Sequence, residues 1–303
     1  MDHRLKRHVL GYWEVAVKPT TAELQSYYAN KYYQEGKGSY ALAYGVDELA
    51  YFKAKLEQRW HVLNPLLFQK KQHAPKKMLD VGCGEGYALA FFQNKGLDVR
   101  GFDFSSAGVE SKNPACRDAL VTGDVFDLLQ KEILSGRKYD VVWLQNVLEH
   151  VLDPIDLLQS LRKLVASDGV AVVTVPNDCS IVQKAARQHG HIDSAFWVSP
   201  PDHLSYFDAG SLNAIARHAN WDCVMTLGDF PVDWLLFHPG SNYVREKALG
   251  GGAHRARVQI ENLIHEQPID ASVEFWAAAG KLGIGRNITA FLKPIADLKS
   301  QPK

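Results

Sequence analysis

Three glycines, Gly82, Gly84 and Gly86, follow a short apolar run and could bring the backbone close to a ligand. Glycine tolerates the left-handed conformations of a tight turn, and its missing side chain lets N–H groups approach a bound molecule. The apolar residues 78–81 predict the end of a buried strand, and residues 87–93 predict a helix whose N-terminus points at the same place. A strand, a glycine turn and a helix in this order predict the nucleotide-binding end of a doubly wound α/β domain.

Two acidic residues follow at positions where they could bind parts of a nucleotide. Asp103 lies in a second predicted strand, 99–104, about 20 residues beyond the glycine turn, where a carboxylate can accept hydrogen bonds from both ribose hydroxyls. Asp124 follows the apolar run 119–122 and could reach an adenine amino group, although an aspartate before a helix is also an ordinary helix cap. The third glycine of the dinucleotide fingerprint is replaced by Tyr87.

Together these motifs resemble those of the class I S-adenosylmethionine (AdoMet)-dependent methyltransferases. The segment 80–86 resembles their first motif, Asp103 the acidic end of their second strand, and Asp124 their adenine-side acid. The segment 139–151 resembles the fourth-strand motif of the branch that methylates small molecules. The resemblance implies an α/β fold with a Rossmann-like seven-stranded sheet, in which six strands are parallel, the last is antiparallel, and helices cover both faces. It also implies AdoMet as cofactor and S-adenosyl-L-homocysteine as product.

The expected cofactor site consists of ten residues near the ends of the first four strands. The glycine turn would hold the methionine end of AdoMet, with Asp80 orienting the loop, as the resemblance implies. Gln145 and Asn146 end the fourth strand, at the rim where open α/β sheets bind ligands. The full set is Asp80, Gly82, Gly84, Gly86, Asp103, Phe104, Asp124, Val125, Gln145 and Asn146.

Composition limits the class of protein. Lys+Arg and Asp+Glu are both 34 in a chain of 303 residues, so the net charge is zero and no nucleic-acid partner held by a general basic field is expected. The four cysteines form no C-x-x-C pair and predict reduced thiols rather than disulfides or a zinc site. No apolar run approaches the roughly 18 residues needed to span a bilayer, and the N-terminus lacks the apolar segment of a secretion signal. We therefore expect a soluble, cytoplasmic protein.

The chain is expected to divide into an N-terminal extension, residues 1–75, and a methyltransferase core, residues 76–303. Dense aromatic residues in the extension predict either a cap over the active site or the packing of a small helical subdomain. Apolar periodicity predicts a helix over residues 47–64. The first core strand is expected at 77–81, and the strands not yet named are expected at 140–144, 170–175, 223–227 and 287–292, with a turn at 167–169.

An insertion, residues 229–282, is expected before the last strand. It holds three consecutive glycines at 250–252, interpreted as a hinge, and a predicted helix over 254–265. A segment of this size inside a compact domain usually has structure and a purpose. Exposed aromatic residues suit both pockets and interfaces, so a substrate lid and a homodimer surface both remain open.

Two histidines are candidates for a catalytic base. Methyl transfer from a sulfonium is an in-line displacement, and a hydroxyl acceptor must lose a proton. His150 follows the fourth strand and His203 follows the fifth, and the ordinary pKa of histidine suits proton removal near neutrality. Either ring could instead only hydrogen-bond its own loop, and an unprotonated amine acceptor would need no strong base.

Five further residues are candidates for contact with the acceptor: Tyr33, Asn177, Trp197, Tyr206 and Arg286. Arg286 could meet an anionic acceptor, and a surface salt bridge is the plainer interpretation. The spacing of His189, His191, Asp193 and Asp202 matches no metal-binding pattern, so no metal is predicted.

The expected function is methylation of a small molecule. The segments 18–34 and 283–294 resemble bacterial polysaccharide-cluster methyltransferases, which favours O-methylation of a sugar or nucleotide-sugar hydroxyl in polysaccharide biosynthesis. N-methylation of an amino sugar and O-methylation of a phenolic or quinone precursor, as in ubiquinone synthesis, remain open. A domain that binds AdoMet without catalysis, as the partner of another protein, is the alternative from a different class.

Overall fold

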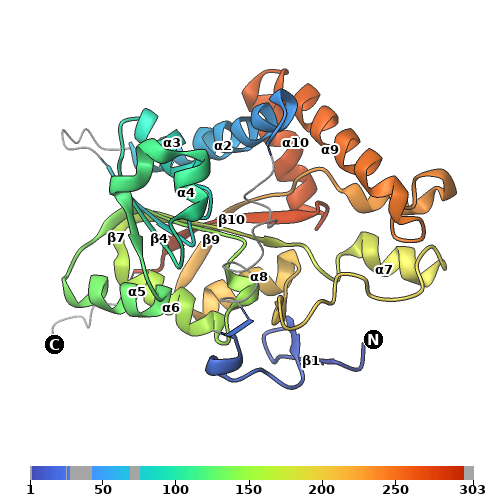
Figure 1. Ribbon diagram of the computed structural model, residues 1–303, viewed down its shortest axis with the longest axis horizontal. Helices are drawn as coiled ribbons and strands as arrows, with labels where there is room; N and C mark the ends of the chain where they lie inside the picture. Colours follow the sequence, from blue (N-terminus) through green and yellow to red (C-terminus); the bar gives the residue numbers. More distant parts are fainter. Residues whose placement is uncertain (1, 25, 28–42, 69–75, 297–303) are drawn as a thin grey trace.

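A seven-stranded sheet forms the centre of the molecule, with strands in the order β5-β4-β3-β6-β7-β10-β9 (Figure 1). The computed structural model describes residues 2–24, 26–27, 43–68 and 76–296. In chain order the strands are β3 (Lys77–Val81), β4 (Asp98–Asp103), β5 (Leu120–Thr122), β6 (Tyr139–Gln145), β7 (Val165–Pro176), β9 (Trp221–Leu227) and β10 (Asn287–Pro294). β10 runs antiparallel to both β7 and β9, and the other pairings are parallel. The predicted fold class is confirmed.

One expected turn lies inside a strand. Residues 167–169 belong to β7, where the pairing with β6 passes from Tyr139 opposite Val165 to Val141 opposite Val170. The extra residues on β7 form an irregularity in the ladder, which explains why Gly169 resembled a turn. A Cβ there would lie 2.8 Å from the carbonyl oxygen of Asp140, so the neighbouring strand passes too close for a side chain.

Helices cover both faces of the sheet (Figure 1). One face carries α2 (Val46–Leu67), α3 (Tyr87–Asn94) and α10 (Ile269–Lys281), and the other carries α5 (Val125–Leu134), α6 (Pro154–Leu164) and α8 (Ala209–His218). Successive strand residues enter opposite clusters: Val142 and Leu144 pack with α6, whereas Val141 and Trp143 pack on the α2 side. Burial on both faces explains why the parallel strands are apolar nearly throughout.

A second, smaller sheet joins the N-terminus to the core. β1 (Leu5–Arg7) pairs with β2 (Trp13–Val15), and β2 pairs with β8 (Ser205–Tyr206). The N–H of Val15 also donates to the carbonyl of Leu204 at 3.0 Å. The first described residues therefore form a strand pair that supports the segment after β7. The helix predicted in the N-terminal extension is α2.

The insertion before β10 is mostly helical. The 3-10 helices η4 (Val232–Phe237), η5 (Pro239–Ser241) and η6 (Lys247–Leu249) precede α9 (Gly250–His265) and α10. The glycines at 250–252 form the first turn of α9, so their interpretation as a hinge is wrong. α9 packs against α2, and α10 packs against both α2 and β9.

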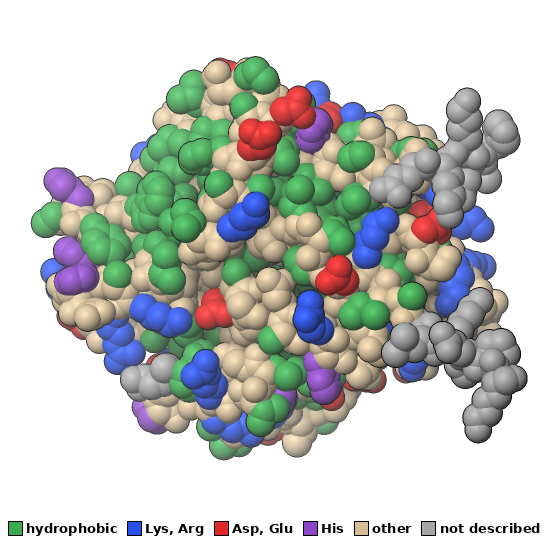
Figure 2. Space-filling view, turned by 180° about the vertical axis from the view of Figure 1, so that it is seen from behind, with side chains coloured by type: hydrophobic (Ala, Val, Ile, Leu, Met, Phe, Trp, Pro, Cys, Tyr) green, Lys and Arg blue, Asp and Glu red, His purple; other side chains and the backbone are tan. Residues whose placement is uncertain are grey.

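Hydrophobic side chains gather on the surface over α9 and α10 (Figure 2). Leu263, Phe275 and Leu282 are each more than half exposed. The described surface therefore offers apolar side chains on this part of the insertion, and the lid and the homodimer surface stay predictions. No helix among the described residues is both long enough and apolar enough to cross a bilayer.

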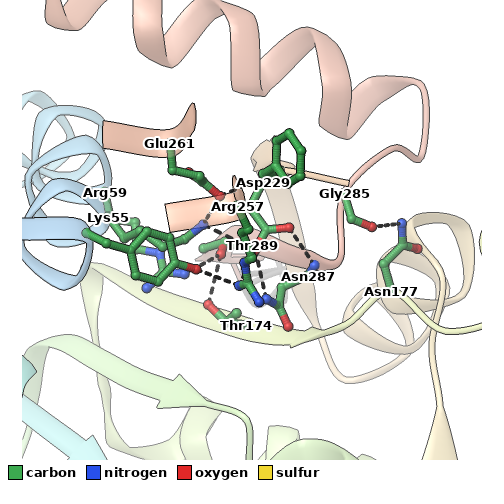
Figure 3. A network of polar contacts seen from close by, with 12 residues as sticks. Lys55, Arg59, Thr174, Asn177, Asp229, Arg257, Glu261, Gly285, Asn287 and Thr289 are labelled. Atoms are coloured by element: carbon green, nitrogen blue, oxygen red, sulfur yellow. Dashed lines mark hydrogen bonds and ion pairs between the residues drawn. The ribbon is translucent and has the colours of Figure 1, made fainter. Parts of the chain in front are cut away.

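A buried charge network ties this insertion to α2 (Figure 3). Lys55 of α2 lies 3.1 Å from Asp229 and 2.9 Å from Glu261 of α9, and Arg257 of α9 lies 3.4 Å from Asp229. Asp229 also accepts hydrogen bonds from the N–H and the side-chain amide of Asn287, at 2.7 and 2.8 Å. One carboxylate thus connects α2, α9 and the start of β10.

We expect Asp229→Asn to lower the free energy of unfolding by about 3 kcal/mol, because it leaves the mostly covered cations Lys55 and Arg257 with fewer carboxylates. Urea unfolding at pH 7 measures this change. The matched control is Asp222→Asn on β9, whose pair with Arg217 is long and exposed and should contribute less than about 0.5 kcal/mol. Equal losses in the two variants would contradict the role given to Asp229.

The stability difference between wild type and Asp229→Asn should depend on pH. Burial opposes the charge of Asp229, but Lys55 and Arg257 lower its pKa from 3.8 to about 2. Because the folded pKa is the lower one, the stabilisation is fully present above about pH 4 and is lost as the pH falls through 2. The difference in unfolding free energy between wild type and Asp229→Asn should therefore shrink as the pH falls from 4 toward 2. A difference that stayed constant over that range would argue against this charge effect.

Candidate active site

The glycine turn lies between β3 and α3 and has the left-handed backbone that its sequence predicted. Gly82, Gly84 and Gly86 have φ values of +74°, +54° and +76°. A Cβ on Gly82 would lie 2.5 Å from Cγ2 of Val147, just after β6. A Cβ on Gly108, in α4 (Ala107–Lys112), would lie 2.4 Å from the carbonyl oxygen of Gly84. Both contacts require glycine, so neighbouring segments pack directly on the turn.

Asp103 is held at the end of β4 by backbone donors. The N–H of Gly84 donates to Oδ2 at 2.8 Å, and the N–H of Ser105 donates to Oδ1 at 3.1 Å. Burial raises the pKa of this carboxyl, and the backbone donors oppose that rise. The next residue, Phe104, leaves 44% of its surface exposed. Asp103 is thus fixed against the glycine turn beside an exposed ring, and the ribose and adenine contacts of Asp103 and Phe104 remain predictions.

Two of the expected cofactor residues lie deeper or are engaged in local contacts. Asp80 is buried, and burial together with nearby Asp103 raises its pKa to about 8. Asp124 caps α5 by accepting hydrogen bonds from Phe126 and Asp127 N–H groups through Oδ1. The cap interpretation of Asp124 is therefore confirmed, and Oδ2 is the atom through which it could also bind a ligand. Val125 follows as the first, buried residue of α5.

Gln145 and Asn146 lie exposed at the carboxyl end of β6. Nη1 of Arg59, from α2, donates to Oε1 of Gln145 at 2.8 Å. Its Nη2 donates to the hydroxyl of Thr289 at 3.2 Å (Figure 3). Asn146 has a φ of +53°, and its N–H donates to the carbonyl of Thr174 at 2.9 Å. The chain therefore turns sharply at Asn146, directly after β6.

Both candidate bases lie together just beyond this turn. His150 ends η3 (Leu148–His150), and its ring centroid is 4.8 Å from that of His203, with the two rings nearly perpendicular. Nδ1 of His150 lies 2.6 Å from the carbonyl oxygen of Asp202. Its Nε2 lies 3.8 Å from Oε1 of Glu149. The fold thus brings together two histidines from segments more than 50 positions apart.

Carboxylates surround these rings. Glu149 is 1% exposed, and burial raises its pKa to about 8. Asp178, equally buried, has Oδ2 at 3.9 Å from Nδ1 of His203, which is too long for a hydrogen bond. Burial opposes protonation of His203, but Asp178 and Glu149 outweigh it and raise its pKa. Glu149 and Asp178 were not among the predicted site residues.

Arg286 belongs to this cluster rather than to the surface. Its Nη1 donates to Oδ1 of Asp178 at 3.0 Å, and although burial disfavours its charge, Asp178 and Asp233 raise its pKa. The interpretation of Arg286 as part of a surface salt bridge is wrong, because Asp178 is buried and the side chain of Arg286 is only 23% exposed. Its contact with an acceptor remains a prediction.

The other predicted acceptor residues have structural contacts. Nδ2 of Asn177 donates to the carbonyls of Gly283 and Gly285, each at 2.9 Å. The hydroxyl of Tyr206 donates to the carbonyl of His203 at 2.8 Å, so this buried ring fixes the His203 segment. Trp197 is buried in an apolar cluster beside that segment. Tyr33 lies outside the described residues.

Sequence reasoning missed the acids around the histidines because their neighbours in space are far away in the chain. Glu149 directly precedes His150, and Asp178 follows Asn177, so each acid lies next to a predicted site residue. The one available signal was the position of both acids just after a core strand, at the ligand-binding rim. The His189–Asp193 segment lies elsewhere, and only Asp202 of that candidate metal set reaches the cluster.

Comparisons with known proteins identify the family of this chain. The model of a family described as a methyltransferase domain matches residues 52–226. The ubiquinone biosynthesis O-methyltransferase of Haemophilus ducreyi is 35% identical over 128 residues, covering 39% of this chain and 54% of that protein. The protein of the same name from Pectobacterium atrosepticum is 35% identical over 141 residues, covering 40% and 57%. The chain therefore spans little more than half the length of these relatives.

A solved structure of coclaurine N-methyltransferase, bound to N-methylheliamine and SAH, superimposes with a TM-score of 0.50 at 14% identity. The match covers 92% of this chain and 84% of that chain, and it shows a shared fold. The family model covers more than half of the chain, which confirms the predicted family and its AdoMet cofactor. The chain belongs to the methyltransferase domain family, as a class I AdoMet-dependent methyltransferase.

Proposed function

We propose that this protein transfers the methyl group of AdoMet to a hydroxyl of a small molecule, and that the acceptor enters beside Glu149, His150 and His203. The observation that carries the proposal is the contact of Val147 with Gly82. This contact puts the cofactor turn within three residues of His150, at the carboxyl rim of one sheet. A methyl donor and a group able to take a proton would then be neighbours.

Within this proposal, His203 is the base. The acceptor oxygen attacks the methyl carbon, the carbon–sulfur bond breaks to leave S-adenosylhomocysteine, and the hydroxyl proton passes to the ring of His203. The carboxylates of Asp178 and Glu149 favour the protonated ring, because they raise its pKa against the effect of burial. Nδ1 of His150 is engaged by the carbonyl of Asp202, which suits a positioning role for that ring.

The cofactor residues have separate parts in the proposal. The glycine turn would bind the methionine end of AdoMet, and Asp103 would accept hydrogen bonds from the ribose hydroxyls. Phe104, Asp124 and Val125 would form the adenine side. Asp80 is buried beneath the turn and would act by holding it.

Two acceptor classes are supported by different observations. A sugar or nucleotide-linked sugar is favoured by the resemblance of the terminal segments to polysaccharide-cluster enzymes and by Trp234 and Phe237, exposed on η4, which offer aromatic faces for a sugar ring. A phenolic acceptor is favoured by the relatives, which are named for ubiquinone biosynthesis. Release of S-adenosylhomocysteine, measured across nucleotide sugars, free sugars and catechols, separates these classes. AdoMet binding without turnover on any acceptor would favour the non-catalytic alternative.

Asp103→Ala should weaken AdoMet binding by at least about 30-fold, because each hydrogen bond to a charged group contributes roughly 1.5–3 kcal/mol. Isothermal titration calorimetry measures the dissociation constant. Asp118→Ala, at an exposed acid of η2 (Pro114–Ala119), is the matched control and should bind as wild type does. Binding by Asp103→Ala within threefold of wild type would remove Asp103 from the cofactor site.

His203→Ala should lower kcat by about 10²–10⁴-fold while AdoMet binding stays unchanged, because a lost general base affects only proton transfer. Steady-state kinetics with the best acceptor from the panel, together with calorimetry, measure both quantities. His189→Ala is the control, since that histidine is exposed and lies outside the cluster. Full turnover by His203→Ala would exclude it as the base.

A further inference from the structure

Three side chains of the candidate site meet in an arrangement that suits a metal ion. Glu149, His150 and His203 each offer one ligand atom, and these atoms all lie within 4.8 Å of one another. No metal was expected from the sequence, where the residues considered as ligands were His189, His191, Asp193 and Asp202, whose spacing matches no metal-binding pattern. The structure supplies the missing proximity, since η3 and the segment before β8 lie side by side.

The hydrogen bond of His150 to Asp202 indicates which of its ring nitrogens would face a cation. A carbonyl oxygen only accepts hydrogen bonds, so at 2.6 Å from Asp202 the Nδ1 atom must carry the proton. In the neutral ring Nε2 then holds the lone pair, and this is the atom that faces Glu149 at 3.8 Å. Metal-binding histidines commonly donate their second N–H to a carbonyl in this way.

The carboxylate of Glu149 gives an independent reason to expect a ligand. Glu149 is 1% exposed, and neither of its carboxylate oxygens has a hydrogen-bond partner among the described residues. The same holds for Oδ2 of Asp178, which is also 1% exposed. Buried polar groups without partners are uncommon and costly, and a bound cation would satisfy them.

The charges around the cluster also suit a divalent cation. Glu149, Asp178 and Asp202 contribute three carboxylates, and Arg286, 3.0 Å from Asp178, contributes one positive charge. With Glu149 ionised, as coordination of a cation requires, and with both imidazoles neutral, the local formal charge is −2. The rings of His150 and His203 keep about a fifth of their side-chain surface exposed, which leaves a path from solvent.

We propose that Glu149, His150 and His203 bind one divalent cation of the zinc type. Two imidazoles and one carboxylate match the three protein ligands of catalytic zinc sites, which keep a further position for substrate. Nitrogen donors favour Zn²⁺ or Co²⁺ over Mg²⁺, which prefers oxygen ligands.

The use of this cation rests on the proposed function. An acceptor hydroxyl that entered the open position would have its pKa lowered by the cation, and its proton would pass to solvent. The oxygen would then attack the methyl carbon of AdoMet, with His203 serving as a ligand in the metal-loaded enzyme and as the base in the metal-free one. An alkyl hydroxyl holds its proton more tightly than a phenol, so a sugar acceptor would gain most from the cation.

The test measures metal binding alone, on the full chain without AdoMet or acceptor. Protein stripped with a chelator is titrated with Zn²⁺ in competition with a chromophoric chelator, and with Co²⁺ followed by visible absorption. Wild type should bind one equivalent of Zn²⁺. Glu149→Gln and His203→Ala should each weaken binding by at least about 100-fold, because losing a ligand costs more than the roughly 10- to 100-fold of a lost outer-shell partner. His189→Ala should bind as wild type does.

Zn²⁺ should also raise the Tm of wild type but not that of Glu149→Gln. The melting transition of Glu149→Gln shows at the same time that this variant is folded. Absence of stoichiometric binding in wild type, or equal binding in the folded Glu149→Gln variant, would overturn the proposal. Turnover by an enzyme that binds no metal would sink this inference and leave the proposed function standing. Metal binding without turnover on any acceptor would leave the metal site standing and count against the proposed function.

Discussion

The close contact between Gly82 and Val147 is the constraint on which the two halves of the site depend. A side chain on Gly82 would overlap Val147 at 2.5 Å, so the end of β6 can pack on the cofactor turn only because that residue is glycine. The glycine turn is also held from its other side, where the N–H of Gly84 donates to Oδ2 of Asp103. The position of the histidine cluster relative to the glycine turn therefore depends on one missing Cβ, and the turn itself is held by a hydrogen bond from a backbone N–H to the carboxylate of Asp103.

The rim beyond β6 and β7 is fixed by two buried charge networks that end on β10 or just before it. Asp229 connects α2 and α9 to Asn287, and Asp178 connects the cluster to Arg286, the residue before Asn287. Because β10 is antiparallel, its start lies at the carboxyl ends of the parallel strands. An antiparallel last strand thus delivers polar anchors to the rim that a parallel strand would place at the opposite edge.

Much of the fold and of the glycine turn could be predicted from the sequence, because the patterns that indicate them lie within short segments. The glycine turn, Asp103 and the apolar strands depend on neighbouring residues, and their assignments agree with the fold within a few positions. The wrong predictions concern features that depend on contacts between distant segments. Gly169 and the glycines at 250–252 resembled a turn and a hinge, but tertiary packing placed them in a strand irregularity and in the first turn of α9. The pairing of Arg286 with Asp178 and of His150 with His203 joins distant segments, which no local pattern reveals.

The N-terminal strands support the segments that carry the histidine cluster. β2 pairs with β8, Val15 binds the carbonyl of Leu204, and Leu204 donates to the carbonyl of Glu149 at 2.8 Å. This chain of backbone contacts fixes the segment carrying His203 against the one carrying Glu149. Two loops that leave neighbouring parallel strands would otherwise be free to separate, and the distances between their side chains would vary. Chemistry that depends on both loops, whether proton transfer or coordination of a cation, therefore requires the start of the chain as well as its methyltransferase core.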